Sequence, residues 1–178
     1  MSEQRLKQGM VHVYTGNGKG KTTAALGLAF RAIGQGLNVH MIQFMKGDKE
    51  SGEIIQAKKC SNFTITQFGR SGFVDRFNPD KIDIDFARKG LIYASDMAKS
   101  GECDLLILDE INVAVAWNLI GLNEVLDIIN SRSKGVEIVL TGRNASDEII
   151  EIGDYVTEMM EIKHPYGAGM SAREGIEY

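Results

Sequence analysis

A glycine-rich segment near the N-terminus combines the residue types that bind phosphate. It consists of Thr15, Gly16, Asn17, Gly18, Lys19, Gly20, Lys21, Thr22 and Thr23. It matches the phosphate-loop pattern GxxxxGK(S/T) at Gly20, Lys21 and Thr22, but Thr15 stands at the first glycine of the pattern and Gly16 follows one position late. Glycines let backbone N–H groups surround phosphate oxygens, and a helix that starts at the loop adds the positive end of its dipole. The segment therefore predicts a phosphate-binding loop.

Three side chains of this loop could act on a bound nucleotide. Lys21 supplies a mobile positive charge for phosphate oxygens, which makes it a candidate catalytic residue, and Thr22 supplies a hydroxyl for Mg²⁺. Lys19 either contacts phosphate or is solvated. A glycine-rich turn without a ligand is the alternative, but the apolar strand pattern before the loop and the helical pattern after it favour the phosphate site.

A pair of carboxylates follows the most apolar strand pattern of the chain. Residues 105–108 are Leu-Leu-Ile-Leu, and Asp109 and Glu110 come directly after them. Phosphate-loop proteins hold Mg²⁺ with an acid at such a strand end, so we expect Asp109 and Glu110 to bind the metal. The alternative is that Asp109 only caps a helix that begins near Ile111. Because an adjacent glutamate can activate water, the residues alone also permit an ATPase.

Other polar side chains follow further strand patterns. Gln43 lies at the end of residues 39–44 and Lys46 follows them, Arg143 follows residues 136–140, and His164 lies in the C-terminal tail. Arg143 is a candidate catalytic residue because an arginine beside a phosphate site can pair with anions through two N–H groups. His164 could be a base, a ligand or a packed ring. Each of these residues could also belong to an ordinary surface loop.

The elements that must position these residues alternate along the chain. Strands are expected at residues 11–14, 39–44, 63–68, 105–108, 136–140 and 155–162, and helices at residues 22–35, 52–59, 80–99, 122–130 and 147–151. This alternation predicts an α/β fold of the RecA-like phosphate-loop type, with a mostly parallel sheet and helices on both faces. We expect one domain over residues 1–178, a flexible tail over 1–9, and a C-terminal segment, 163–178, near the active site.

Composition narrows the class of protein. The chain has 178 residues, 20 basic and 24 acidic side chains, and a net charge of −4. This charge gives little support to a nucleic-acid partner. The polar N-terminus lacks the apolar core of a signal peptide, and no apolar run approaches the length of a membrane span. We therefore expect a cytoplasmic protein with no membrane partner.

With these motifs placed, the chain resembles the ATP:corrinoid adenosyltransferases of the cobalamin pathway. The resemblance covers nearly the whole chain in five blocks, at residues 14–25, 42–47, 108–111, 141–143 and 156–178. It includes the displaced glycine Gly16 and the inner lysine Lys19. The resemblance implies that ATP and a reduced corrinoid are the substrates, that Co(I) attacks the 5′-carbon of ATP, and that the whole triphosphate leaves. Lys21 and Mg²⁺ would neutralise that leaving group, and Glu110 would serve the metal or the ribose. A homodimer and a reduced flavoprotein electron donor are also implied.

One loop departs from the family pattern. Better-known members carry two aromatic residues after the third strand, which displace the lower cobalt ligand. In residues 69–77 Phe73 matches the first aromatic, Asp75 stands at the second position, and Phe77 follows. We expect Phe73 to contact the corrinoid, and Phe77 could compensate for Asp75.

Two other classes of function compete with the transferase. One is a RecA-like ATPase or a small-molecule kinase, and the other is a nucleotide-dependent regulatory binder. A kinase would need a lid over its acceptor, and the chain has no long arginine-rich insertion. A binder without chemistry would not need the complete set of Lys21, Thr22, Asp109 and Glu110.

Overall fold

The computed structural model describes residues 6–47 and 51–177. Six strands form one sheet: β1 (Val11–Thr15), β2 (Val39–Phe44), β3 (Phe63–Phe68), β4 (Leu105–Asp109), β5 (Glu137–Thr141) and β6 (Tyr155–Glu158). The helices are α1 (Lys21–Gly34), α2 (Gly52–Ala57), α3 (Lys81–Ser100), α4 (Ile111–Ala116), α5 (Leu122–Ser131) and α6 (Asp147–Ile152), and a 3₁₀ helix follows at Pro165–Ala168. The expected single α/β domain is confirmed.

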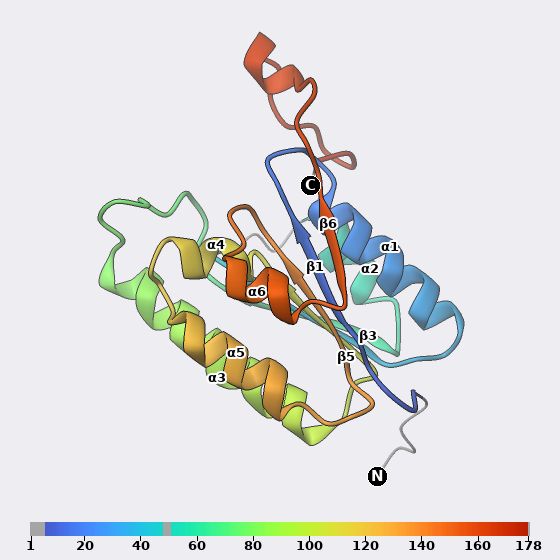
Figure 1. Cartoon of the computed structure of the whole chain (residues 1–178). Coiled ribbons are helices and arrows are strands. Elements are labelled where there is room, and N and C mark those ends of the chain that lie inside the picture. The colour runs from blue at the N-terminus through green and yellow to red at the C-terminus, as the bar shows by residue number, and fades with distance from the viewer. Residues whose placement is uncertain (1–5, 48–50, 178) are drawn as a thin grey trace.

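The sheet brings the loops of interest to one edge. Its strand order is β3-β2-β4-β5-β1-β6, and every neighbouring pair is parallel. The carboxyl ends of all six strands therefore point the same way, toward the top of Figure 1. Ligands of such sheets bind beyond this edge. The phosphate loop, the acidic pair and Arg143 all follow strands here.

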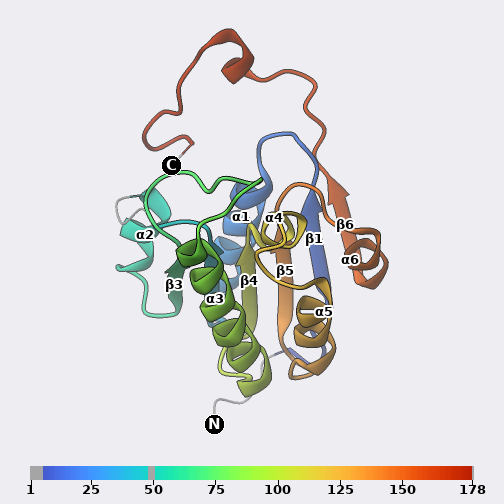
Figure 2. The ribbon, with the colours of Figure 1, turned by 90° about the vertical axis from the view of Figure 1, so that its left-hand side faces the viewer.

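Helices cover both faces of the sheet, as expected. Helices α1 and α2 lie on one face, and α3, α4, α5 and α6 lie on the other (Figures 1 and 2). In β4 the buried side chains alternate between the two sides: Leu106 and Leu108 join the core under α3 and α5, whereas Leu105 and Ile107 join the core under α1. A central parallel strand is apolar throughout because both of its faces are covered.

The last strand is shorter than expected. The sequence pattern predicted a strand over residues 155–162, but β6 ends at Glu158. Its only described neighbour, β1, ends at Thr15, where the chain curls into the phosphate loop, so no straight partner continues beyond this point. Met159 instead binds the phosphate loop. Its N–H donates to Thr15 O at 2.9 Å, and its carbonyl oxygen accepts from Gly18 N at 2.6 Å.

Only part of the N-terminal tail that was expected to be flexible lies within the described residues. Residues 1–5 of the expected flexible tail lie outside the described residues, and Gly9 is buried, with its N–H donating to Lys134 O at 2.8 Å. Among the helices of the described residues, none is both long enough and apolar enough to cross a membrane.

A polar cluster joins three strands at the amino-terminal half of β1. Glu137 Oε1 lies 2.6 Å from His12 Nε2, and Glu137 Oε2 accepts from Met10 N at 2.6 Å. The His12 ring stacks on Tyr155 of β6, with 4.6 Å between centroids. Burial alone would raise the pKa of Glu137, but the hydrogen bonds from His12 and Met10 outweigh it and hold this pKa below its ordinary value.

This cluster predicts a pH dependence of stability. Because folding lowers the pKa of Glu137, its contribution is present above the ordinary value of 4.5 and is lost as pH falls through the lowered pKa. Glu137→Gln removes the charged acceptor and should cost about 1 kcal/mol at pH 7, or a Tm lower by roughly 3 °C. Thermal melts from pH 7 to 3 should show the variant converging on wild type in acid. The exposed Glu151→Gln is the control, and equal melts for all three proteins at pH 7 would contradict the assignment.

Candidate functional site

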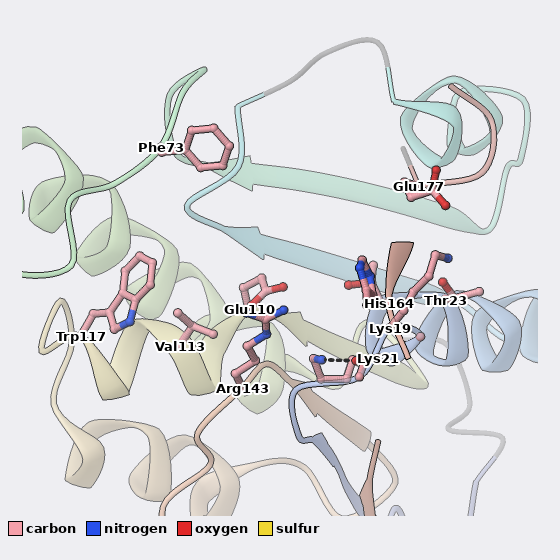
Figure 3. A pocket seen from close by; sticks show the side chains of 13 residues that line it. Lys19, Lys21, Thr23, Phe73, Glu110, Val113, Trp117, Arg143, His164 and Glu177 are labelled. Carbon is pink, nitrogen blue, oxygen red and sulfur yellow. Dashed lines mark hydrogen bonds between the residues drawn. The ribbon is translucent and has the colours of Figure 1, made fainter. Parts of the chain in front are cut away.

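A cavity of about 490 Å³ opens at the carboxyl edge of the sheet (Figure 3). It is bordered by the phosphate loop, the start of α4, the loop after β5, and the C-terminal tail. The lining residues are Gly18, Lys19, Gly20, Lys21, Thr22, Thr23, Phe73, Glu110, Val113, Trp117, Arg143, His164 and Glu177. Most of the residues proposed from the sequence are thus brought together. Thr15, Gly16, Asn17, Gln43, Lys46 and Asp109 lie behind or beside this wall.

Lys21 is folded into the phosphate loop. Its Nζ donates to Gly16 O at 2.8 Å and to Gly18 O at 2.7 Å, and the residue is buried. Burial lowers the pKa of Lys21, and the positive charge of Arg143 lowers it further, while Glu110 opposes both. The loop backbone therefore holds this cation at the place where phosphate oxygens would bind.

The displaced glycine has a steric cause. Gly16 adopts a φ of +91°, and a Cβ there would lie 2.5 Å from Met159 O. A Cβ at Gly18 would lie 2.7 Å from Met160 O. The chain leaving β6 thus packs directly on the loop, and only residues without a side chain fit beneath it. Thr15 can precede them because it is the last residue of β1, where its Oγ1 accepts from Ala145 N at 3.2 Å.

Asp109 is wholly buried and fully paired. Its Oδ1 accepts from Thr22 Oγ1 at 2.9 Å and from Thr141 Oγ1 at 2.7 Å. Its Oδ2 accepts from Lys46 Nζ at 2.6 Å. Burial opposes the charge of Lys46, but Asp109 outweighs this effect and raises the pKa of the lysine. The alternative role of Asp109 as a helix cap does not hold, because Glu110 is the residue that precedes α4.

Glu110 reaches the cavity from a turn. Its φ of +63° places it in the left-handed region, and its N–H donates to Thr141 Oγ1 at 2.9 Å. Its side chain lies beside that of Arg143 in the wall of the cavity (Figure 3). Burial and then the charge of Asp109 raise the pKa of Glu110. Arg143 donates to Asn17 O at 3.4 Å, which links the loop after β5 to the phosphate loop.

A second, larger cavity of about 840 Å³ adjoins the first. Lys46 lines it together with apolar residues of α1, and its wall shares Thr22, Thr23, Phe73 and Glu177 with the first cavity. Gln43 lies behind this wall: its Nε2 donates to Glu53 Oε1 at 3.1 Å and its Oε1 accepts from Gln67 at 2.9 Å. Gln43 therefore orients polar groups that line the second cavity.

The loop after β3 presents an exposed aromatic ring to both cavities. The Phe73 side chain is fully exposed. Arg70 anchors the loop on α3 through two hydrogen bonds of 2.8 Å to the Asp83 carboxylate and a further contact with Asp80. Asp75 has a local role, because its Oδ1 accepts from Phe77 N at 2.9 Å and so closes a turn.

The C-terminal tail and α4 complete the first cavity, and three of their residues, Glu177, Val113 and Trp117, were not singled out by the sequence analysis. His164 lines the first cavity, and its Nδ1 accepts from Tyr166 N at 3.2 Å. Glu177 lines both cavities and pairs with Arg173. Val113 and Trp117 complete the far wall. A short helix directly after the acidic pair was the one signal that could have pointed to them.

The chain is similar to known proteins in sequence and in fold. A family model described as ATP:corrinoid adenosyltransferase BtuR/CobO/CobP matches residues 7–178. A corrinoid adenosyltransferase of Escherichia coli K12 is 34% identical, with 97% of this chain and 87% of that protein aligned. The corrinoid adenosyltransferase CobA of Salmonella typhimurium is 32% identical over 100% of this chain and 90% of that protein. A KaiC-like protein of Pyrococcus horikoshii shares the fold, with a TM-score of 0.54 at 17% identity over 86% of this chain and 73% of that chain.

Gly16→Ala tests the packing of β6 on the phosphate loop. The added methyl would require both a positive φ and contact with Met159 backbone, so we expect at least about tenfold weaker nucleoside triphosphate binding, from 1–2 kcal/mol of backbone strain plus the displaced contact. Gly27→Ala is the matched control, because Gly27 lies in α1 with nothing within 4 Å. That change should stabilise the protein by up to about 1 kcal/mol. Calorimetric titrations and thermal melts measure both, and unchanged binding by Gly16→Ala would refute the steric explanation.

Proposed function

The chain belongs to the family of ATP:corrinoid adenosyltransferases, and from this membership we propose how its residues transfer the 5′-deoxyadenosyl group of ATP to a reduced corrinoid. In this reaction the electron pair of Co(I) forms a bond to the 5′-carbon. The bond from that carbon to the triphosphate oxygen breaks, and its electron pair leaves with the triphosphate. Cobalt becomes Co(III), and no attacking water is required.

The pair of adjoining cavities carries this proposal. A two-substrate transfer needs one site for each substrate and a place where the two meet. The first cavity contains the phosphate loop, and the second is larger and lined by apolar residues of α1. Phe73 belongs to both walls. We assign ATP to the first cavity and the corrinoid to the second, with the reacting atoms meeting beside Phe73.

The phosphate loop would stabilise the leaving triphosphate. Lys21, Lys19 and Arg143 place positive charge along the first cavity, and the start of α1 adds its dipole. Charge accumulates on the triphosphate as the carbon–oxygen bond breaks, so these groups act more strongly in the transition state than in the ground state. Glu110, at the middle of the cavity, would accept a hydrogen bond from the ribose or serve the metal.

The residues present fit a magnesium ion. Among the described residues no group of three His, Cys, Asp or Glu is arranged to hold a metal ion, but Mg²⁺ on a nucleotide needs only one or two protein oxygens. Thr22 donates its hydroxyl hydrogen to Asp109, which leaves the oxygen lone pairs available to a cation. Because Lys46 occupies Asp109 Oδ2, we assign Thr22 the direct contact and Asp109 the orienting role. When bound, the ion would neutralise charge on the triphosphate.

Three further assignments rest on the family resemblance. We propose a homodimer, a reduced flavoprotein as electron donor, and a cytoplasmic location. Phe73 would contact the corrinoid and help to displace its lower ligand, and Phe77 is the second aromatic of the same loop.

A product assay tests the transferase directly. With Mg-ATP and chemically reduced corrinoid we expect a cobalt–carbon bond and intact triphosphate, whereas ADP and phosphate without a corrinoid product would favour an ATPase.

Lys21→Ala should lower turnover by about 100-fold, since one charged donor is removed from the transition state. Lys89→Ala, an exposed lysine on α3, is the control and should keep wild-type turnover.

Phe73→Ala separates ligand displacement from transfer. The variant should lose more turnover when the assay starts from Co(II) corrinoid with a reductant than when it starts from Co(I), because Co(I) no longer holds a lower ligand. Phe77→Ala is the comparison within the same loop and should be affected less, since Phe77 lies outside the walls of both described cavities. Equal losses from the two cobalt states would argue against displacement by Phe73.

A further inference from the structure

We propose that Trp117 is the platform for the adenine base, with the indole ring stacked on the base at the end of the first cavity opposite the phosphate loop. This inference deepens the proposed function, because it rests on ATP occupying that cavity. It adds a residue that favours purine over pyrimidine nucleotides.

The order of side chains along the cavity carries the argument. Lys21 and the phosphate loop lie at one end, Glu110 and Arg143 lie in the middle, and Val113 and Trp117 form the far wall (Figure 3). A nucleoside triphosphate has the same order of chemistry: an anionic chain, a ribose with hydroxyl groups, and an aromatic base. With its phosphates on the loop, the base lies toward the aromatic and aliphatic end.

The cavity walls favour the base over the corrinoid as the partner of Trp117. Phe73 lines both cavities, as expected for a residue where the two substrates meet. Trp117 and Val113 line the first cavity and are absent from the walls of the second. A ring confined to the nucleotide side is placed to contact the nucleotide.

Backbone hydrogen bonds fix the main chain at Trp117, and core packing holds one side of its indole. Trp117 ends α4, and its N–H donates to Val113 O at 2.9 Å. Asn118 then turns the chain with a φ of +55°, and Leu119 N donates to Ala114 O at 2.9 Å. Trp117 is half-buried against the core, so part of it is packed while part lines the cavity. A fixed aromatic ring loses little conformational entropy when a ligand binds.

Stacking predicts a graded preference among bases. Every base has a flat aromatic face, and a purine overlaps an indole more than a pyrimidine does. We therefore expect ATP and GTP to bind more tightly than CTP and UTP through this contact. Triphosphate without a base should gain nothing from it.

Trp117 can report on its own contact, because it is the single tryptophan of the chain. Mg-ATP should quench its fluorescence, and inorganic triphosphate bound to the same loop should not. Trp117→Ala should weaken ATP binding by about tenfold, the lower range for loss of one base–aromatic stack. Triphosphate affinity should stay unchanged. Trp117→Phe should restore most of the ATP affinity, while Trp117→Leu, which keeps apolar volume without a ring, should behave like the alanine variant.

Calorimetric titrations of ATP, CTP, triphosphate and a Co(II) corrinoid decide the outcome. Equal ATP affinity for wild type, Trp117→Leu and Trp117→Phe would overturn the stacking assignment and leave the transferase proposal intact. Loss of corrinoid affinity with unchanged ATP affinity would also overturn it, by moving Trp117 to the other substrate. Wild-type protein that binds neither ATP nor triphosphate would overturn both proposals. If Trp117→Ala does not fold, as thermal melts would show, the Leu and Phe variants carry the comparison.

Discussion

Asp109 carries a charge at a position with no exposure to solvent, and the upper edge of the sheet is organised around that fact. A buried carboxylate is tolerated only when it is paired and hydrogen-bonded. Here the partners come from three other segments: Thr22 at the start of α1, Gln43 and Lys46 at and after the end of β2, and Thr141 at the end of β5. Each partner is fixed because leaving Asp109 unsatisfied would cost several kcal/mol. One residue thereby sets the positions of four loops that border the two cavities.

The close packing of β6 on the phosphate loop is the second constraint. Gly18 N donates to Met159 O, so this backbone N–H of the loop holds the chain that leaves the edge strand. The same contact requires glycine at position 16 rather than 15, since position 15 still belongs to β1. The tail beyond β6 leaves from this contact and loops back beyond the carboxyl edge of the sheet (Figure 2), and its residue Glu177 lines both cavities. The unusual spacing of the loop is therefore linked to the path of the C-terminal segment.

The sequence predicted what depends on local pattern. The apolar strand patterns located every strand of the described sheet. The phosphate motif and the acidic pair were placed correctly at strand ends. It did not predict the hydroxyl of Thr141 on Asp109, the end of β6 at Glu158, or Trp117 in the cavity wall. Each of these depends on segments that are distant along the chain. Thr141 and Asp109 are 32 residues apart, and nothing near either residue indicates the other.

Local charge explains how an acidic chain can hold a polyanion. The net charge is −4, so the overall field does not attract triphosphate. At the site, however, Lys46 neutralises Asp109, and the three cations Lys19, Lys21 and Arg143 outnumber the two carboxylates Glu110 and Glu177 along the first cavity. The fixed N–H groups of the loop add to this excess without adding net charge. Because burial disfavours the charged form of Lys21, a bound anion would stabilise its ammonium group more than solvent would. Burial and a bound anion therefore act on the pKa of Lys21 in opposite directions.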